Sequence, residues 1–158
     1  SRSARLHGVR ATLLPGGHTL SAAEPRTPPT GPVGRYLHEP DGAVIRAHLL
    51  AEVADAVGGW LIDPSIAYVS ADELVRTPYA TAYEITDVLP FHLKRLRALL
   101  REREVGSLTV KKRGSPIEPE ELRRKVKPRG KGSATVFLTR VADAPSMLLG
   151  HPVPRPTD

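Results

Sequence analysis

The pattern on which the architecture depends lies in PFHLKRLRALLREREVG (90–106), SLTVKK (107–112) and PEELRRKV (119–126). Pro90 marks the start of a helix, and the leucines at positions 93, 96, 99 and 100 form its core-facing stripe. Leu108 and Val110 alternate with polar neighbours, which predicts a strand with a basic end. Gly106 is expected to stop the first helix, Pro119 to open the second and Pro128 to end it. These residues therefore predict a helix, a strand and a second helix.

Strands are expected on both sides of this block. Tyr79 to Val88 carries aromatic and β-branched residues in partial alternation, as half-buried strands do. Ala134 to Val141 and Met147 to Leu149 predict two more strands, joined by a turn at 143–145. The order strand, helix, strand, helix, strand, strand predicts an α/β (α+β) fold, in which helices pack on a small mixed β-sheet.

The first half of the chain is less regular. Gly8–Leu14 and His18–Leu20 predict two short strands around a turn, and an isolated hairpin is marginal in water. We expect it either to pack on the next domain or to be the edge of a sheet whose other strands are missing. Four prolines in residues 24–32 predict a semi-rigid linker. Residues 40–57 predict one helix, which Asp41 caps and Gly58 with Gly59 ends, and 66–69 predict a strand.

Positive charge is concentrated in one part of the chain. Residues 90–132 hold 14 basic residues and five glutamates, whereas the whole chain has a formal net charge of +6. Such asymmetry is the usual electrostatic sign of phosphate binding, and it makes RNA the first partner to consider. The alternative is a solvated face in a protein whose 17 arginines outnumber its six lysines.

We predict a basic RNA-binding surface, built from a helix face, a strand end and a loop. Lys94, Arg97 and Arg101 recur at i, i+3 and i+7 on one helix. The low count of two Phe, four Tyr and one Trp favours recognition of backbone and shape over reading of bases. The predicted RNA-binding residues are Lys94, Arg97, Arg101, Lys111, Lys112, Arg113, Arg124, Lys127, Arg129 and Lys131.

Several classes of site find no support in the sequence. Zero cysteines exclude a disulfide framework, thiolate zinc and a cysteine nucleophile, and no glycine-rich phosphate loop follows a strand. The six histidines show no metal-ligand spacing, so His38, His48 and His92 are expected to be ordinary surface or core residues. We therefore predict no catalytic, cofactor-binding or metal-binding residue, no membrane partner and a cytoplasmic location.

The basic block resembles a known family. LKRLRALLREREVGSLTVKKRGSPIEPEELRRKVKPRGKGSATVFLTRV (93–141) resembles the THUMP-like domain at the C-terminus of a group of bacterial S-adenosylmethionine-dependent methyltransferases. GRYLHEPDGAVIRAHLL (34–50) is similar to the entry segment of that module, and the resemblance covers about 31–150. The strand pair at 8–20 is similar to the closing hairpin of the class I methyltransferase domain that precedes the module in such proteins.

The resemblance implies a domain plan and a partner. Residues 1–24 would be the C-terminal hairpin of a truncated methyltransferase domain, 25–33 a Pro-rich linker, 34–150 the THUMP-like domain and 151–158 a disordered tail. The chain opens on Ser1 rather than methionine, and we expect it to be an excised fragment. The parent would use S-adenosylmethionine, bound outside this fragment, and its own N-terminal methyltransferase domain would be a partner.

Two functions remain open from the sequence. THUMP domains are associated with RNA binding in tRNA-modifying enzymes, so the resemblance implies an accessory domain that presents tRNA or rRNA for methylation. The alternative is a structural or interaction module that stabilises the methyltransferase domain and positions a non-nucleic-acid substrate. A stand-alone enzyme is disfavoured, because the sequence offers no nucleophile, metal site or cofactor loop.

Overall fold

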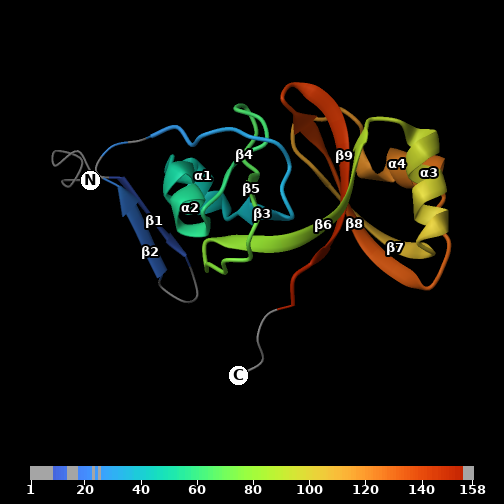
Figure 1. Ribbon diagram of the computed structural model, residues 1–158, viewed down its shortest axis with the longest axis horizontal. Helices are drawn as coiled ribbons and strands as arrows, with labels where there is room; N and C mark the ends of the chain where they lie inside the picture. Colours follow the sequence, from blue (N-terminus) through green and yellow to red (C-terminus); the bar gives the residue numbers. More distant parts are fainter. Residues whose placement is uncertain (1–8, 14–17, 23, 25, 155–158) are drawn as a thin grey trace. The chain divides into compact units, whose positions relative to one another are not determined.

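The computed structural model describes residues 9–13, 18–22, 24 and 26–154 (Figure 1). The chain forms two compact units, the first ending at Ala82 and the second beginning at Tyr83. Each unit is described by itself below.

The first unit begins with a two-stranded antiparallel ribbon. β1 (Val9–Leu13) pairs with β2 (His18–Ala22), which confirms the two predicted strands. Gly8, Leu14 and the predicted turn at 15–17 lie outside the described residues. Leu20 of β2 packs against the buried cluster of Val44, Leu49 and Val53, so the ribbon is attached to the helices that follow it.

Those helices are two where the sequence predicted one. α1 (Gly42–Arg46) and α2 (Leu50–Val57) are separated at His48, whose φ of 57° is left-handed and interrupts the helical path. The predicted caps are confirmed. Asp41 accepts a hydrogen bond from the Ala43 N–H at 2.9 Å, and Gly58 ends α2 with a φ of 66°.

Three short strands complete the regular structure of this unit. β3 (Tyr36–Pro40), β5 (Val69–Ala71) and β4 (Trp60–Leu61) form antiparallel pairs in the order β4-β5-β3. The strand predicted at 66–69 is displaced, because the Ile66 N–H donates to the Asp63 carbonyl and turns the chain before Val69.

The proline-rich segment is fastened to this unit along its length. The Arg26 guanidinium contacts Glu52 at 2.7 Å and Asp55 at 2.6 Å on α2. Backbone hydrogen bonds connect Pro29 and Gly31 to Leu61 of β4. Four prolines remove donors, but the Pro29 carbonyl and the Gly31 N–H are still paired with a strand. The segment expected to be a linker is thus packed on α2 and β4, and the division between the units falls later, after Ala82.

The second unit has the predicted order of elements. It contains β6 (Ala80–Pro90, which begins in the first unit), α3 (Leu93–Glu102), β7 (Val105–Lys112), α4 (Pro119–Val126), β8 (Gly132–Val141) and β9 (Ala144–Pro152). The sheet order within this unit is β6-β9-β8-β7. β7 and β8 are parallel, whereas β9 is antiparallel to both of its neighbours. A parallel pair needs a crossover, and α4 supplies it. The predicted mixed α/β architecture is confirmed.

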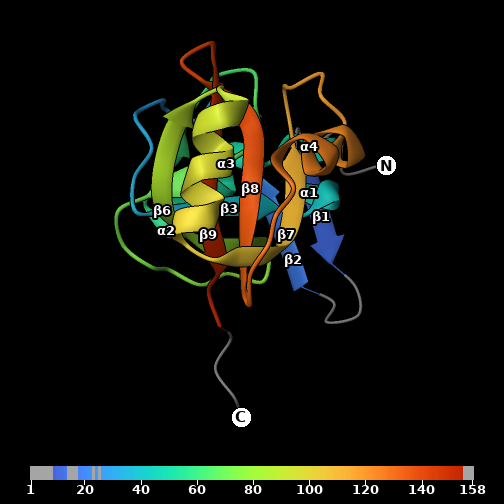
Figure 2. The ribbon, with the colours of Figure 1, turned by 90° about the vertical axis from the view of Figure 1, so that its right-hand side faces the viewer.

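Both helices of the second unit cover one face of its sheet (Figure 2). Leu96 and Leu100 of α3 and Leu122 and Val126 of α4 are buried in one cluster with sheet residues such as Met147. On β8 the buried side chains alternate between this helix-covered face and the opposite one. The core thus fixes how α3 and α4 are rotated, and with that which of their cations reach solvent.

Two predicted boundaries need correction. Gly106 lies inside β7 rather than at the end of α3, which ends at Glu102 with Arg103 as its C-cap and Glu104 in a left-handed conformation. A Cβ at Gly106 would collide with the Gly130 carbonyl, so the glycine permits a close approach of two backbones. The tail predicted from 151 is also partly wrong, since His151 and Pro152 extend β9 against β6. Residues 155–158 are outside the described part of the chain.

Candidate nucleic-acid interface

α3 carries three predicted RNA-binding cations beside its core stripe. Burial of Leu96 and Leu100 sets the rotation of the helix. As a result Lys94 and Arg101 are exposed, and Arg97 between them is half-buried. The three positions are spaced by about one helical turn each, so α3 offers a row of positive charge next to α4.

A cleft opens where α3 meets α4. It has a volume of about 330 Å³ and is lined by Leu93, Lys94 and Arg97 of α3 and by Lys125 of α4. The Arg97 guanidinium donates to the backbone carbonyl of Lys125, in the last turn of α4. This contact satisfies a helix-terminal carbonyl and holds the two helices together at the cleft. We call this site the α3–α4 cleft.

The charge of the α3–α4 cleft is only partly balanced. Among the described residues, Lys94 makes no ion pair, and Arg97 bonds a neutral carbonyl. Lys125 lies 3.2 Å from Glu121, and both side chains are substantially exposed. Exposed pairs of this kind contribute little and are screened by salt. The cleft therefore presents three cations with one nearby carboxylate, which suits an anionic group such as a phosphate.

The remaining predicted cations of α4 lie on its exposed side. Arg124 is exposed on the helix, and Lys127 is exposed just beyond it, where its φ of 47° ends the helix. Neither makes an ion pair within the part of the chain that the structure describes. Glu120 and Glu121 lie in the first turn of α4, where the helix dipole favours anions, so the basic character increases toward its end.

The basic end of β7 is a different environment. Lys111, Lys112 and Arg113 are all half-buried. The Lys112 ammonium lies 2.8 Å from the Glu118 carboxylate, immediately before α4. Lys111 and Arg113 also interact with neighbouring groups. This cluster, called the β7 basic end below, is thus less exposed than the α3–α4 cleft, and like the cleft it has one cation paired with a carboxylate.

Arg129 and Lys131 lie at the other end of the strands. They flank Gly130, which crosses close to Glu104 at the start of β7 and β8. In the ladder Gly132 is opposite Val105, whereas Leu138 is opposite Lys112. Six residues at about 3.3 Å each separate the two ends by about 20 Å. Arg129 and Lys131 are exposed, but they do not share a site with the β7 basic end.

The structure therefore divides the ten predicted residues into groups. Lys94 and Arg97 line the α3–α4 cleft, and Arg101 follows one turn later on the same helix. The other members are Arg124 and Lys127 on α4, Lys111, Lys112 and Arg113 at the β7 basic end, and Arg129 and Lys131 at the opposite end of the sheet. One continuous patch was expected, but one cleft with separate flanking groups is found.

Lys125 is the cleft residue that the sequence analysis omitted. In the structure it pairs with Glu121 at i,i+4. A signal for it was available in the sequence, because Lys125 follows Leu122, which is buried, by three residues and therefore borders the core face of α4. The sequence of α4 alone does not show that α3 packs beside Lys125.

The three histidines singled out from the sequence lie in the core, at a helix cap and on the surface. His38 is fully buried, and its Nδ1 lies 3.2 Å from the Val69 carbonyl oxygen. Burial lowers the pKa of His38 by disfavouring the charged imidazolium, and backbone contacts offset part of that effect. His92 caps α3 by accepting a hydrogen bond from the Arg95 N–H at 3.2 Å. His48 is exposed at the break between α1 and α2.

Two further features of the described residues bear on the kind of site. Among the described residues, no group of three or more histidine, aspartate or glutamate side chains is arranged to hold a metal ion. The helices within the same residues are all too short or too polar to cross a bilayer.

Comparison with known proteins identifies the class to which this arrangement belongs. Residues 80–152 match the family described as THUMP domain-like, and this range contains β6 through β9 with both helices of the cleft. The second unit is thus a THUMP-like domain.

Its relatives include uncharacterized S-adenosylmethionine-dependent methyltransferases of Mycobacterium tuberculosis, from strains CDC 1551 / Oshkosh and ATCC 25618 / H37Rv. Each is 36% identical to this chain over 132 residues, which are 84% of the chain and 36% of the relative. The chain carries a THUMP-like domain in a family whose named relatives are methyltransferases, and the predicted resemblance is confirmed.

A solved structure supports the fold. The crystal structure of a candidate methyltransferase from Porphyromonas gingivalis W83 superposes with a TM-score of 0.76 at 21% sequence identity. The similarity covers 93% of this chain and 38% of that protein. The chain thus spans little more than a third of the length of the proteins that it matches.

Proposed function

We propose that this THUMP-like domain binds structured RNA, tRNA or rRNA, and presents it to a methyltransferase domain of the same protein. The observation that carries the proposal is the α3–α4 cleft, where Lys94, Arg97 and Lys125 converge with one nearby carboxylate. Phosphate contacts position a nucleic acid without reading its sequence, which suits a domain that delivers a substrate. Arg101, Arg124, Lys127, Arg129 and Lys131 would extend the contact along the backbone, and Lys111, Lys112 and Arg113 would add a weaker one.

The relatives are named as S-adenosylmethionine-dependent, so we propose that the parent protein uses the same methyl donor. We assign no residue of this chain to the methyl donor. The strand-to-helix loops of the described residues hold a single glycine, Gly114, and so lack the glycine-rich turn that cradles such cofactors. The donor would bind to the methyltransferase domain of the parent protein, in its cytoplasmic setting.

The first test removes charge from the cleft without changing side-chain length greatly. The double variant Lys94→Gln/Lys125→Gln is compared with Arg76→Gln/Arg95→Gln, which removes two exposed cations that do not line the cleft. Binding of a fluorescent tRNA transcript is measured between about 50 and 300 mM salt, so that the slope of log K against log[salt] can be determined. The cleft variant should bind more weakly and lower the magnitude of the slope of log K against log[salt] by about 2.

The matched control should keep most of the wild-type affinity. Reversal of Lys111, Lys112 and Arg113 to glutamate should weaken binding less per charge than the cleft variant, because these side chains are half-buried whereas Lys94 and Lys125 are exposed. Equal affinity and equal slope for the cleft variant and wild type, with both folded, would contradict the proposal.

The structural alternative makes the opposite prediction. If the module serves to stabilise the methyltransferase domain and position a non-nucleic-acid substrate, deleting it from the full-length parent lowers the melting temperature without RNA present. The isolated chain would then show no salt-dependent RNA affinity. Measuring both quantities on the same preparations separates the two functions.

A further inference from the structure

A second cavity lies at the end of the second unit's sheet, away from the α3–α4 cleft. Its volume is about 240 Å³, and three connections line it. Phe91 comes from the turn between β6 and α3, the loop 114–117 comes from between β7 and α4, and Thr139, Arg140 and Pro145 come from the β8–β9 hairpin. The Phe91 N–H donates to the Pro145 carbonyl at 3.0 Å, and the Arg113 N–H donates to the Leu138 carbonyl at 3.0 Å. The three connections are thus tied to one another through the backbone.

The lining combines apolar walls with a buried polar group. Phe91, Ile117 and Pro145 supply apolar surface, and Phe91 is one of the three large hydrophobic residues exposed in the described part of the chain, at 37%. Thr139 is 2% exposed, and its Oγ1 is buried without a hydrogen-bond partner among the described residues. A buried hydroxyl without a partner is costly, so a polar ligand atom that reached it would remove a penalty.

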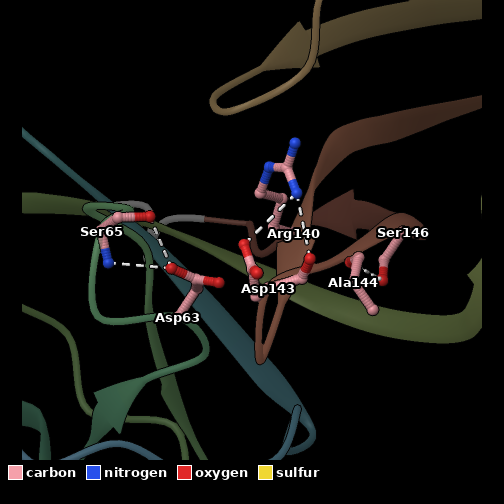
Figure 3. A network of polar contacts seen from close by, with 6 residues as sticks. All are labelled: Asp63, Ser65, Arg140, Asp143, Ala144 and Ser146. Atoms are coloured by element: carbon pink, nitrogen blue, oxygen red, sulfur yellow. Dashed lines mark hydrogen bonds and ion pairs between the residues drawn. The ribbon is translucent and has the colours of Figure 1, made fainter.

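Arg140 stands at the edge of the cavity with part of its guanidinium already engaged. Its Nη1 donates to the Asp143 carbonyl at 3.0 Å and approaches the Asp143 carboxylate at 3.4 Å. Figure 3 shows both contacts, with the other end of the guanidinium turned away from Asp143. The hairpin therefore holds the side chain in place while Nη2 and Nε keep donor capacity.

We infer that this cavity takes one unpaired nucleobase of the bound RNA, an inference that rests on the proposed function. An exposed aromatic ring provides a stacking surface, and a hydroxyl and a guanidinium provide groups for the polar edge of a base. The volume is below the roughly 300–1,000 Å³ of sites for drug-sized ligands, which fits a single ring system. The β7 basic end leads directly into loop 114–117, so a phosphate chain held there can place a base in the cavity.

A purely apolar occupant fits these observations less well. An aliphatic side chain of another protein would fill the walls but leave the Thr139 hydroxyl unsatisfied. It would also gain nothing from Arg140 or from the cations that precede the loop. A free phosphate would meet mostly apolar lining. A base meets both the apolar and the polar parts of the site.

The test compares two RNA hairpins with the same duplex, one blunt and one with a single-stranded 3′ extension. The variants are Thr139→Val, which keeps the shape and removes the hydroxyl, and Phe91→Leu, which keeps an apolar side chain and removes the aromatic ring. Thr139→Val should weaken binding of the extended RNA about three- to tenfold, and Phe91→Leu by a factor within about 5–150. Neither should change the affinity for the blunt RNA or the salt slope. Val88→Ala, an exposed position of β6 outside the cavity, is the control.

A second measurement does not depend on RNA binding by the cleft. Adenosine and cytidine 5′-monophosphates are titrated while the amide signals of Gly114, Ser115, Ile117 and Arg140 are followed by NMR, with ribose 5-phosphate as the base-free control. The nucleotides should shift these signals in wild type and less in Thr139→Val, and ribose 5-phosphate should not. The inference is overturned if ribose 5-phosphate acts as the nucleotides do, or if both variants bind the extended RNA like wild type.

The two proposals fail in different ways. If only the base site is wrong, Lys94→Gln/Lys125→Gln still weakens binding of both hairpins, and the cavity variants do nothing. If the RNA function of the cleft is wrong, neither hairpin binds with a salt dependence, while the mononucleotide titration still reports on the cavity.

Discussion

The two units of this chain differ in the kinds of buried residue that hold their strands and helices together. In the second unit, eleven buried residues from both helices and the sheet join in one apolar cluster. In the first unit, buried polar groups take part in holding the strands: Ser70 and His38 are both fully buried and bonded to backbone groups. Apolar packing tolerates regular, repeating sequence, whereas buried polar contacts depend on particular atoms. The candidate site lies on the surface of the second unit, outside its apolar cluster.

The largest expected effect comes from breaking the apolar cluster. Leu100→Ala on α3 should destabilise the second unit by about 2–5 kcal/mol, because the side chain is 1% exposed in a core that collapses only partly. Chemical denaturation should be followed by circular dichroism and by fluorescence of Trp60, the single tryptophan, which lies in the first unit. The Trp60 transition should move less than the circular dichroism transition. Identical shifts would show that the two units unfold together, so that the difference between their cores does not give them separate unfolding free energies.

A smaller effect on stability is expected from removing a buried hydroxyl, and it should depend on whether that hydroxyl has a hydrogen-bond partner. The Ser70 hydroxyl accepts from the Gly34 N–H at 2.7 Å and donates to the Tyr36 carbonyl at 2.9 Å. Ser70→Ala should therefore cost about 1–3 kcal/mol, since it takes the hydroxyl partner from two partly buried backbone groups. Thr139→Val in the second unit should be neutral or stabilising, because its hydroxyl has no partner among the described residues. Equal losses in urea denaturation would remove the distinction.

The smallest effect concerns pH. Burial lowers the pKa of His38 in the folded chain, so between its folded and its ordinary value near 6.5 the unfolded state binds more protons. Stability is therefore unaffected by this group above about pH 6.5 and falls as the pH decreases below it. His38→Gln cannot be protonated and should flatten the slope of unfolding free energy between about pH 6.5 and 5. An unchanged slope would mean that His38 does not titrate differently on folding.

Local periodicity was sufficient for most of the second unit. The leucine spacing of α3, Pro119 at the start of α4 and the alternation of Leu108 and Val110 in β7 each predicted the correct element. The break at His48 between α1 and α2 could not be predicted, because residues 40–57 keep a helical pattern on both sides of it. The pairing of the proline-rich segment with β4 depends on residues 30 positions away.

The site was predicted in part for the same reason. Clustering of cations in the sequence pointed to α3 and α4, but the cleft depends on how the two helices pack, which brought in Lys125. The cavity was not predicted at all. Phe91, Ile117 and Thr139 come from three connections far apart in sequence, and no local pattern links them. The low aromatic count argued against base recognition. The ring of Phe91, exposed beside the cavity, nevertheless offers a surface on which one base can stack.

The position of Arg123 has a consequence for self-association. β7 is the edge strand of the second unit's sheet, and an open edge can template the addition of a strand from another molecule. The Arg123 Nε donates to the Leu108 carbonyl at 3.2 Å, and α4 contacts the strand. A strand that paired at the Leu108 carbonyl would have to displace this guanidinium.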